Sequence, residues 1–163
     1  MNFANKMSIY HNYFINLKWT GNQGAGTQSY RSYSRDHIVS VEGKPDLPAS
    51  SDSAFRGNPE RYNPEEMLVA SVSSCHMLWY LHLCAVNGVV VMEYFDKATG
   101  KLKENPDGSG QFEDISLYPD IVVKEKGMIE KANALHDEAN KMCFIANSLN
   151  FPVKHFPVIS YLE

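Results

Sequence analysis

The sequence predicts an α+β fold with antiparallel sheets. Two helical and several strand-like segments follow one another in the order ββ–α–ββ–α–β, and short strands joined by turn residues are typical of such sheets. Of the 163 residues, 44% are hydrophobic and 12% aromatic, as in a globular chain with a core. We therefore expect one domain over residues 1–163.

The N-terminal part predicts two strands and a long loop. Apolar side chains alternate over Tyr13, Ile15, Leu17 and Trp19, the pattern of a half-buried strand. After the turn GNQGAGT, residues 29–42 predict a second strand with Val39 and Val41 facing inward. Residues 43–64 are rich in Pro, Ser, Asp and Gly and predict a loop of about 20 residues, longer than compact domains usually carry without a function.

A long helix is predicted from Asn63–Pro64 to Asn87–Gly88. Asn63 is a cap residue, Pro64 suits the first helical position, and Glu65 and Glu66 are favourable at the positive end of the helix dipole. No charged residue follows until Glu93. We expect this helix to be buried on all sides, which in a chain of this size indicates that a second subunit covers part of it.

The remaining elements are predicted strands at residues 89–96 and 109–125, a second helix and a last strand. Asp107–Gly108, in the linker between the strands at residues 89–96 and 109–125, indicates a hairpin. The helix follows Gly127 and ends near Cys143, and its apolar stripe consists of Met128, Ala132, Leu135, Ala139 and Met142. Residues 153–163 form an edge strand, where Pro157 needs no ladder donor.

Charge and composition exclude several classes of partner. A net charge of −4 argues against nucleic acid or an anionic membrane as the main partner. Because His76, His82 and Asn87 interrupt the most apolar stretch, we expect no membrane span, and the N-terminus lacks the apolar segment of a signal peptide. Three cysteines do not form a disulfide framework, so a cytoplasmic location is the expectation.

Polar residues inside the first helix are the most unusual feature. Ser71, Ser73, Ser74, Cys75 and His76 occupy the middle of the apolar segment, although buried hydroxyls without partners are costly. A polar pocket against the helix would explain the serines, and so would close helix packing through small side chains. Both interpretations stay open on the sequence.

The cysteines allow two interpretations. Cys75 and Cys143 are either small buried apolar residues or a redox pair, in which one thiol is oxidised to a sulfenic acid and the other condenses with it. Cys84 lies nearly opposite Cys75 on the helical wheel and is interpreted as packing. A metal site is not expected, because pairs such as Cys75–His82 and His136–Cys143 are separated by about 10 Å of helix, whereas two ligands of one zinc lie within about 4 Å.

A reactive thiol at Cys75 would need a cation from another segment. An apolar helix raises the pKa of a thiol, whereas a nearby arginine lowers it. The long loop offers Arg56 and Arg61, the second strand ends near Arg35, and Glu65 could fix such an arginine through a bidentate ion pair. The competing interpretation makes Glu65 a helix-dipole residue and the arginines solvated surface.

Two segments, NPEEMLVASVSSCHMLWYL and NKMCFIANS, resemble the OsmC/Ohr family of osmotically inducible and organic hydroperoxide resistance proteins, in particular an OsmC-like subgroup. The similarity extends from LKWTG to the last strand. It implies a metal-free and haem-free thiol peroxidase of stress defence that reduces organic hydroperoxides and, less efficiently, hydrogen peroxide. It also implies an intertwined homodimer, with sheets wrapped around long central helices and active sites at the subunit interface.

The resemblance assigns roles to individual residues. Cys75 would be the peroxidatic cysteine, Cys143 the resolving cysteine, and Glu65 the carboxylate that holds the activating arginine. That arginine is Arg56 by analogy with one branch of the family and Arg35 by analogy with the other. No bound cofactor is implied; an external dithiol, for which a lipoyl group is a candidate, would reduce the disulfide.

Helix geometry adds a constraint and leaves an alternative. Glu65 and Cys75 are separated by about 15 Å on a straight helix, so either the helix breaks at its serines or a second subunit brings the groups together. The alternative function is a non-enzymatic OsmC-like dimer that binds a small apolar ligand and uses its cysteines structurally.

Overall fold

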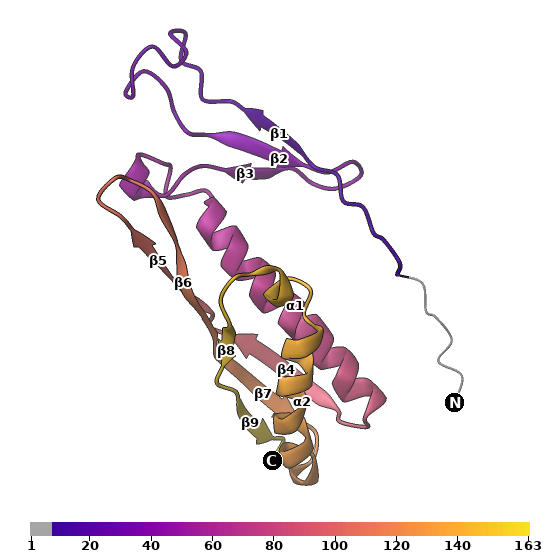
Figure 1. The fold of residues 1–163 in the computed structure, drawn as a ribbon. Coiled ribbons are helices and arrows are strands. Elements are labelled where there is room, and N and C mark those ends of the chain that lie inside the picture. Colours follow the sequence, from indigo (N-terminus) through magenta and orange to yellow (C-terminus); the bar gives the residue numbers. More distant parts are fainter. Residues whose placement is uncertain (1–7) are drawn as a thin grey trace. The chain divides into compact units, whose positions relative to one another are not determined.

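The computed structural model describes residues 8–163, which fall into two compact units with the boundary between Pro64 and Glu65 (Figure 1). The α+β class is confirmed: strands and two long helices follow one another along the chain. The expectation of one domain stays a prediction.

The first unit contains a three-stranded antiparallel sheet. Its strands, β1 (Asn16–Trp19), β2 (His37–Ser40) and β3 (Leu47–Ala49), are neighbours in that order, with Leu17 opposite Val39 and Val39 opposite Leu47. The alternation at the N-terminus predicted a half-buried strand, and this is wrong for the single chain. Every residue of β1 is exposed, and Tyr13 is 87% exposed.

The predicted loop is an ordered segment. It contains β3 and the short 3-10 helix η1 (Ser53–Phe55), whose cap Asp52 accepts a hydrogen bond from the backbone N–H of Ala54. A Cβ on Gly57 would lie 1.5 Å from the carbonyl oxygen of Ser51, so the chain crosses itself where only glycine fits. The sequence pattern did not predict this structure, because the prolines and glycines of the segment are typical of loops.

The second unit begins with the long helix α1 (Pro64–Val86), whose start and end are as predicted. Gly88 has a φ of 73° and the backbone N–H of Val89 donates to the carbonyl of Cys84, an arrangement that ends the helix. The helix is continuous, so it does not break at its serines. Within the chain it buries one face, Val72, His76, Tyr80 and Cys84, and the expected cover of the other faces by a second subunit stays a prediction.

Six strands form two three-stranded sheets in this unit. Short links join the strands in three consecutive pairs, β4 (Val91–Asp96) with β5 (Thr99–Glu104), β6 (Gly110–Leu117) with β7 (Pro119–Val123), and β8 (Val153–His155) with β9 (Val158–Tyr161). The sheet orders are β4-β7-β9 and β5-β6-β8. The second and third links are in contact, because Tyr118 stacks on Phe156 at 5.3 Å and Phe156 N–H donates to the Leu117 carbonyl.

The strand directions differ in part from the prediction. β4–β7 and β5–β6 are antiparallel, but β8 runs parallel to β6 and β9 runs parallel to β7. The helix α2 (Ile129–Met142) provides the crossover between β7 and β8 that a parallel pairing requires. The charged segment KLKE also proves to be part of a strand, β5, which is exposed along its length and lacks apolar alternation.

A core forms between both helices and the β4-β7-β9 sheet. Tyr80 and Cys84 from α1 and the predicted stripe residues Ala132, Leu135 and Ala139 from α2 are buried in it. Between α2 and its neighbouring strands lie two short 3-10 helices, η2 (Lys126–Met128) and η3 (Ala146–Ser148). Gly100 allows close packing elsewhere, because a Cβ there would lie 2.6 Å from Cγ2 of Val69 in α1.

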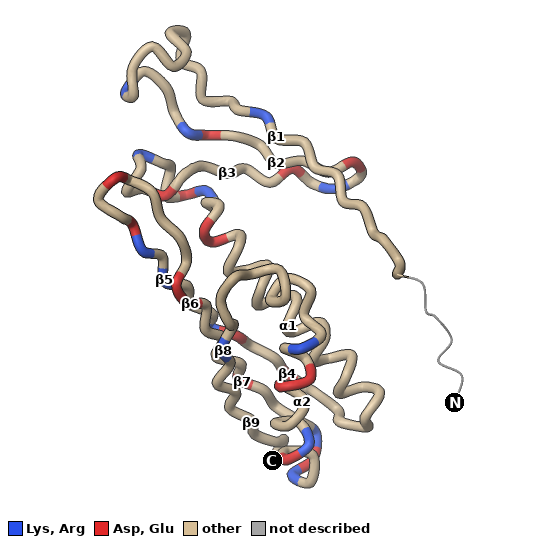
Figure 2. The backbone as a smooth tube through the Cα atoms, in the orientation of Figure 1, with Lys and Arg blue, Asp and Glu red and all other residues tan. Residues whose placement is uncertain are grey.

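The opposite face of α1 carries no charge and is exposed at Ala70, Ser74, Leu78 and His82. Figure 2 shows no charged residue along the helix after its first turn, and Leu78 and Val86 are 61% and 65% exposed. Among residues 8–163, α1 alone is long and apolar enough to cross a membrane by length and composition. The expectation that no segment qualifies is therefore wrong on composition, although a core helix of a soluble protein passes the same test.

Candidate functional site

Cys75 and Cys143 meet in the second unit. Cys75 lies on α1 and is partly exposed, and Cys143 directly follows α2 and is fully buried. Burial, followed by the interaction with the Cys75 thiol, raises the pKa of Cys143 to about 11. The two thiols, far apart in the sequence, are therefore neighbours in the fold and unbridged.

The chain after α2 forms a cradle for the sulfur of Cys143. The backbone leaves helical geometry at Cys143, whose ψ is 108°, and turns into η3. Ala146 N–H donates to Cys143 Sγ at 3.4 Å, and the backbone at Ala146 and Ile145 lowers the pKa of the thiol, in opposition to burial. Backbone donors of this kind stabilise a thiolate.

Separate contacts account for the serines near Cys75. Ser73 Oγ donates to Oδ2 of Asp96 at 2.5 Å, and Oδ1 of the same carboxylate accepts from Tyr118 N–H at 2.7 Å. Asp96 thus joins the turn of α1 just before Cys75 to the bend between β6 and β7. Ser71 Oγ donates to the Leu68 carbonyl at 2.8 Å, and Ser74 is exposed. A polar contact, not small-residue packing, explains Ser73.

Cys84 is a core residue, as predicted. It is 1% exposed, and burial raises the pKa of its thiol. The Tyr80 hydroxyl is its neighbour. Burial, and after it the interaction with Cys84, raises the pKa of Tyr80 far above its usual range. Cys84 is thus separate from the Cys75–Cys143 pair.

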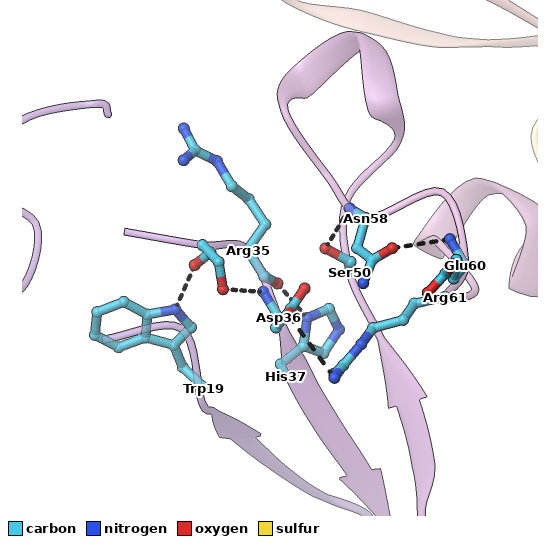
Figure 3. Close-up of polar contacts among 9 residues, drawn as sticks. Trp19, Arg35, Asp36, His37, Ser50, Asn58, Glu60 and Arg61 are labelled. Atoms are coloured by element: carbon cyan, nitrogen blue, oxygen red, sulfur yellow. Dashed lines mark hydrogen bonds and ion pairs between the residues drawn. The ribbon is translucent and has the colours of Figure 1, made fainter. Parts of the chain in front are cut away.

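The candidate arginines lie in the first unit, and Figure 3 shows Arg35 and Arg61. Arg35 donates to the carbonyls of Tyr33 and Tyr30 at 2.7 and 2.8 Å, and its guanidinium carbon lies 4.3 Å from the centre of the Tyr33 ring and 4.2 Å from that of Tyr30. Arg61 is 3.7 Å from Oδ2 of Asp36. Both arginines are thus engaged within the unit, and an approach of either to Cys75 stays a prediction.

Arg56 differs from the other two arginines. Its side chain is exposed, and it is the only non-glycine residue among residues 8–163 with a positive φ, at 65°. Its backbone N–H donates to the Ser53 carbonyl and ends η1 in the left-handed conformation. Such a conformation is uncommon outside glycine, asparagine and aspartate and is unfavourable for arginine.

Glu65 lies in the first turn of α1, ten residues before Cys75 on the same unbroken helix. Its Oε2 is buried and has no hydrogen-bond partner within residues 8–163. Buried carboxylate oxygens usually have a partner. Glu65 therefore offers an acceptor, as the sequence predicted, while its assignment to an arginine stays a prediction.

A cluster of three histidines, two of them buried, lies beside this site and was not predicted. Nε2 of His76 and Nδ1 of His136 are 3.0 Å apart, and the His155 ring lies 5.5 Å from that of His76. Tyr80 stacks on His136 at 3.9 Å. His76 and His136 are each only 1% exposed, and a histidine on an apolar helix face was the available signal. Within residues 8–163 no three His, Cys, Asp or Glu residues are arranged to hold a metal ion.

Comparisons with known proteins agree with the fold. The family model described as OsmC-like protein matches residues 57–155. An OsmC-like protein of unknown function from Vibrio cholerae is 28% identical, with a TM-score of 0.81 over 91% of this chain and 100% of that one. The comparison with curated protein sequences gives no significant match.

Two organic hydroperoxide resistance proteins share the fold at lower identity. The protein from Elizabethkingia anophelis is 20% identical, with a TM-score of 0.67 over 94% of this chain and 100% of that one. OhrB of Bacillus subtilis is 17% identical, with a TM-score of 0.60 over 90% and 98% of the two chains. With its family model and its fold in agreement, the chain belongs to the OsmC/Ohr family of OsmC-like proteins.

Proposed function

We propose that the protein is a cysteine-based peroxidase that reduces organic hydroperoxides. The observation that supports this most is the contact between Cys75 and Cys143, two unbridged thiols of unequal exposure. A peroxidase of this type needs one thiol that substrate can reach and a second that can form a disulfide with it. Two proteins of the same fold are named organic hydroperoxide resistance proteins, which supports organic hydroperoxides as the substrate class.

The two cysteines have different roles. Cys75 is partly exposed and meets the substrate, whereas Cys143 is fully buried. With a pKa of about 11, Cys143 is protonated at neutral pH and reacts poorly with peroxide. Cys75 is therefore the peroxidatic residue and Cys143 the resolving residue.

The first step breaks the O–O bond. The Cys75 thiolate attacks one oxygen of the hydroperoxide ROOH, forming Cys75–SOH and releasing RO⁻, which takes up a proton and leaves as ROH. The sulfur loses two electrons and the peroxide gains them. Trp79 packs edge-on against Phe144 at 5.7 Å, and Phe144 is exposed, so apolar surface for an organic group lies beside Cys143.

The second step forms the disulfide. Cys143–SH condenses with Cys75–SOH, giving the 75–143 disulfide and water. Oxidation of Cys75 removes the thiol that opposed ionisation of Cys143, while the backbone donors at Ala146 and Ile145 remain. An external dithiol, for which a lipoyl group is a candidate, then reduces the disulfide and is itself oxidised by two electrons. No bound cofactor takes part in this cycle.

Arg56 is the candidate for the residue that activates Cys75. An arginine would stabilise both the thiolate and the departing alkoxide. Arg56 is favoured over Arg35 because Arg35 is held by two carbonyls and two tyrosine rings, whereas Arg56 is exposed on a strained backbone. Strain of this kind is concentrated at functional sites. Glu65 supplies the buried carboxylate oxygen that would hold it.

The protein acts as a homodimer in this proposal. The face of α1 that carries Leu78 is apolar and uncovered, and large exposed apolar surfaces mark interfaces. Because α1 is unbroken between Glu65 and Cys75, the two side chains of one chain stay apart along the helix. A second subunit would let the carboxylate–arginine pair of one chain approach the thiol of the other. The proposed location of this dimer is the cytoplasm.

Thiol counting tests the proposal against the non-enzymatic alternative. The denatured protein is titrated for free thiols before and after one equivalent of cumene hydroperoxide. The expected count falls from three per chain to one, because Cys84 remains reduced. Three remaining thiols would contradict a peroxidase and favour a dimer that binds a small apolar ligand and uses its cysteines structurally.

A further inference from the structure

Three histidines from separate elements meet in the core of the second unit. His76 comes from α1, His136 from α2 and His155 from β8. The centres of the three rings are 5.3, 5.5 and 5.9 Å apart. The peroxidase cycle described above uses none of them, and residues of this kind are seldom fully buried without a reason.

The central contact is the hydrogen bond between His76 and His136. Nε2 of His76 and Nδ1 of His136 are 3.0 Å apart, and the ring planes differ by 9°. Burial lowers the pKa of His76 to about 4 and that of His136 to about 3, so both rings are neutral at pH 7. One ring therefore donates and the other accepts.

Stability alone does not account for this pair. Nδ1 of His76 and Nε2 of His136 are buried and have no hydrogen-bond partner within residues 8–163. Burying such atoms is costly, and two apolar side chains of similar shape would avoid the cost. The hydrogen bond between the rings, formed only in one geometry, instead favours one specific arrangement of the two helices.

The arrangement that it fixes concerns the two thiols. His76 directly follows Cys75 on α1, and His136 lies two helical turns before Cys143 on α2. The hydrogen bond therefore joins the helix of one thiol to the helix of the other, and opposes sliding or rotation between them. Disulfide formation tolerates little displacement, because the Cα atoms must lie within about 7 Å and the Cβ atoms within about 4.5 Å.

We propose that His76 and His136 are positioning residues that hold α1 and α2 in the register in which Cys75 and Cys143 form their disulfide. The proposal rests on the redox pairing of these cysteines in the proposed function. Neither histidine touches substrate in this account; both act through the helices. His155 supports the pair from β8, where its Nε2 lies 3.5 Å from Oδ1 of Asp137.

Equilibration with glutathione tests the proposal without any peroxide. The reaction is protein dithiol plus GSSG giving protein disulfide plus two GSH, and the 75–143 disulfide is quantified by mass spectrometry. In His76→Leu and His136→Leu the equilibrium constant for disulfide formation is expected to fall about 10- to 100-fold, because misplaced groups lose effective concentration. Equilibrium constants like that of the unchanged protein would overturn the proposal.

Matched variants separate positioning from loss of stability. Asn at position 136 places an amide near the site of Nδ1, whereas Gln places it near Nε2. His136→Asn is therefore expected to stay within about threefold of the unchanged protein and His136→Gln to fall with the Leu variants. Both substitutions are polar, so this comparison serves even if the Leu variants do not fold. Equal values for Asn and Gln would overturn the proposal.

Two further variants serve as controls. Val72→Ala removes buried volume from the same face of α1, and His82→Leu removes an exposed histidine from the same helix. Both are expected to keep the glutathione equilibrium. A fall in Val72→Ala equal to that in His136→Leu would show a general effect of destabilisation and overturn the proposal.

Peroxide kinetics then distinguish this proposal from the proposed function. In an active enzyme, His136→Leu should leave the rate of sulfenic acid formation unchanged and slow disulfide formation about 10-fold or more. An unchanged rate of disulfide formation in an active enzyme would overturn the proposal. A protein that consumes no peroxide but shows the glutathione effect would contradict the peroxidase and support the positioning role.

Discussion

The Cys75 thiol on α1 is a neighbour of the Cys143 thiol at the end of α2 and is one of the causes that raise the pKa of Cys143. This proximity turns two cysteines from distant segments into a candidate redox pair. It also explains their difference, because the buried member is protonated at neutral pH while the partly exposed member remains open to substrate.

Substitution of each cysteine should give a different phenotype. Cys75→Ser is expected to reduce consumption of cumene hydroperoxide to the rate in buffer. Cys143→Ser should allow one turnover and then over-oxidation of Cys75, because no thiol remains to resolve the sulfenic acid. Serine retains an acceptor for Ala146 N–H, so the fold around position 143 is preserved. A Cys75→Ser protein with the native rate would refute the assignment.

The arginine assignment predicts a difference between Arg56 and Arg35. Arg56→Met should lower the second-order rate constant for organic hydroperoxide about 100-fold or more, the usual effect of losing one electrostatic stabiliser. Arg35→Met should have little effect on that constant, because Arg35 already binds carbonyls and tyrosine rings in its own unit. Stopped-flow measurement of both variants decides between them, and the reverse order would transfer the role to Arg35.

Ser73 and Ser74 form a matched pair for stability. Ser73→Ala removes the hydrogen bond to the Asp96 carboxylate and should cost about 1 to 3 kcal/mol of unfolding free energy, a typical value for a bond to a charged group. Ser74 is exposed, so Ser74→Ala should be neutral or slightly stabilising because alanine favours helix. Urea denaturation measures both, and equal values would refute the role of Asp96.

The buried histidines predict acid sensitivity. The pKa values of His76 and His136 are about 4 and about 3 in the folded protein, below the usual value of about 6.5. The unfolded chain therefore binds more protons below pH 6.5, and stability falls as the pH decreases from there towards 3. At pH 5 the loss is about 2 kcal/mol for each histidine that stays neutral in the fold.

Urea denaturation at pH 7 and pH 5 measures this effect. A protein in which both histidines are replaced, His76→Gln with His136→Asn, should lose most of the difference between the two pH values. His82→Leu, which removes an exposed histidine, should retain it. A difference that persists in the double variant would place the acid sensitivity elsewhere.

The uncovered face of α1 predicts the oligomeric state. Leu78→Glu places a charge on this apolar surface and should convert a dimer into a monomer, whereas Leu78→Ala should only weaken the dimer. Sedimentation velocity over a range of concentrations separates these outcomes. A Leu78→Glu protein that remains a dimer would show that the interface lies on another surface.

The sequence predicted those features of the fold and site that depend on local patterns. Asn63–Pro64 and Gly88 marked the ends of α1, and the stripe through Ala132, Leu135 and Ala139 marked the buried face of α2. The likeness of the segments around Cys75 and Cys143 predicted the family. The parallel pairing of β8 with β6 and of β9 with β7 depends on long-range topology. The order of strand, helix and strand along the chain was its only local sign.

Other features depend on contacts that no local pattern contains. Asp96 is the last residue of β4 and gives no sign that it binds Ser73, and His155 lies beyond α2 yet stacks with His76. How much of α1 its own chain covers could not be predicted, because an apolar, charge-free helix gives the same sequence pattern whether its own chain or another chain covers it. The exposed aromatic residues before β1 were misjudged for the same reason.

Mass spectrometry of the protein treated with one equivalent of cumene hydroperoxide tests the central claim most directly. A digest made under conditions that block free thiols should contain one cross-linked species, in which the peptide with Cys75 is joined to the peptide with Cys143, while Cys84 is blocked as a free thiol. Blocked thiols at all three cysteines after peroxide treatment, or a bridge that includes Cys84, would contradict the account.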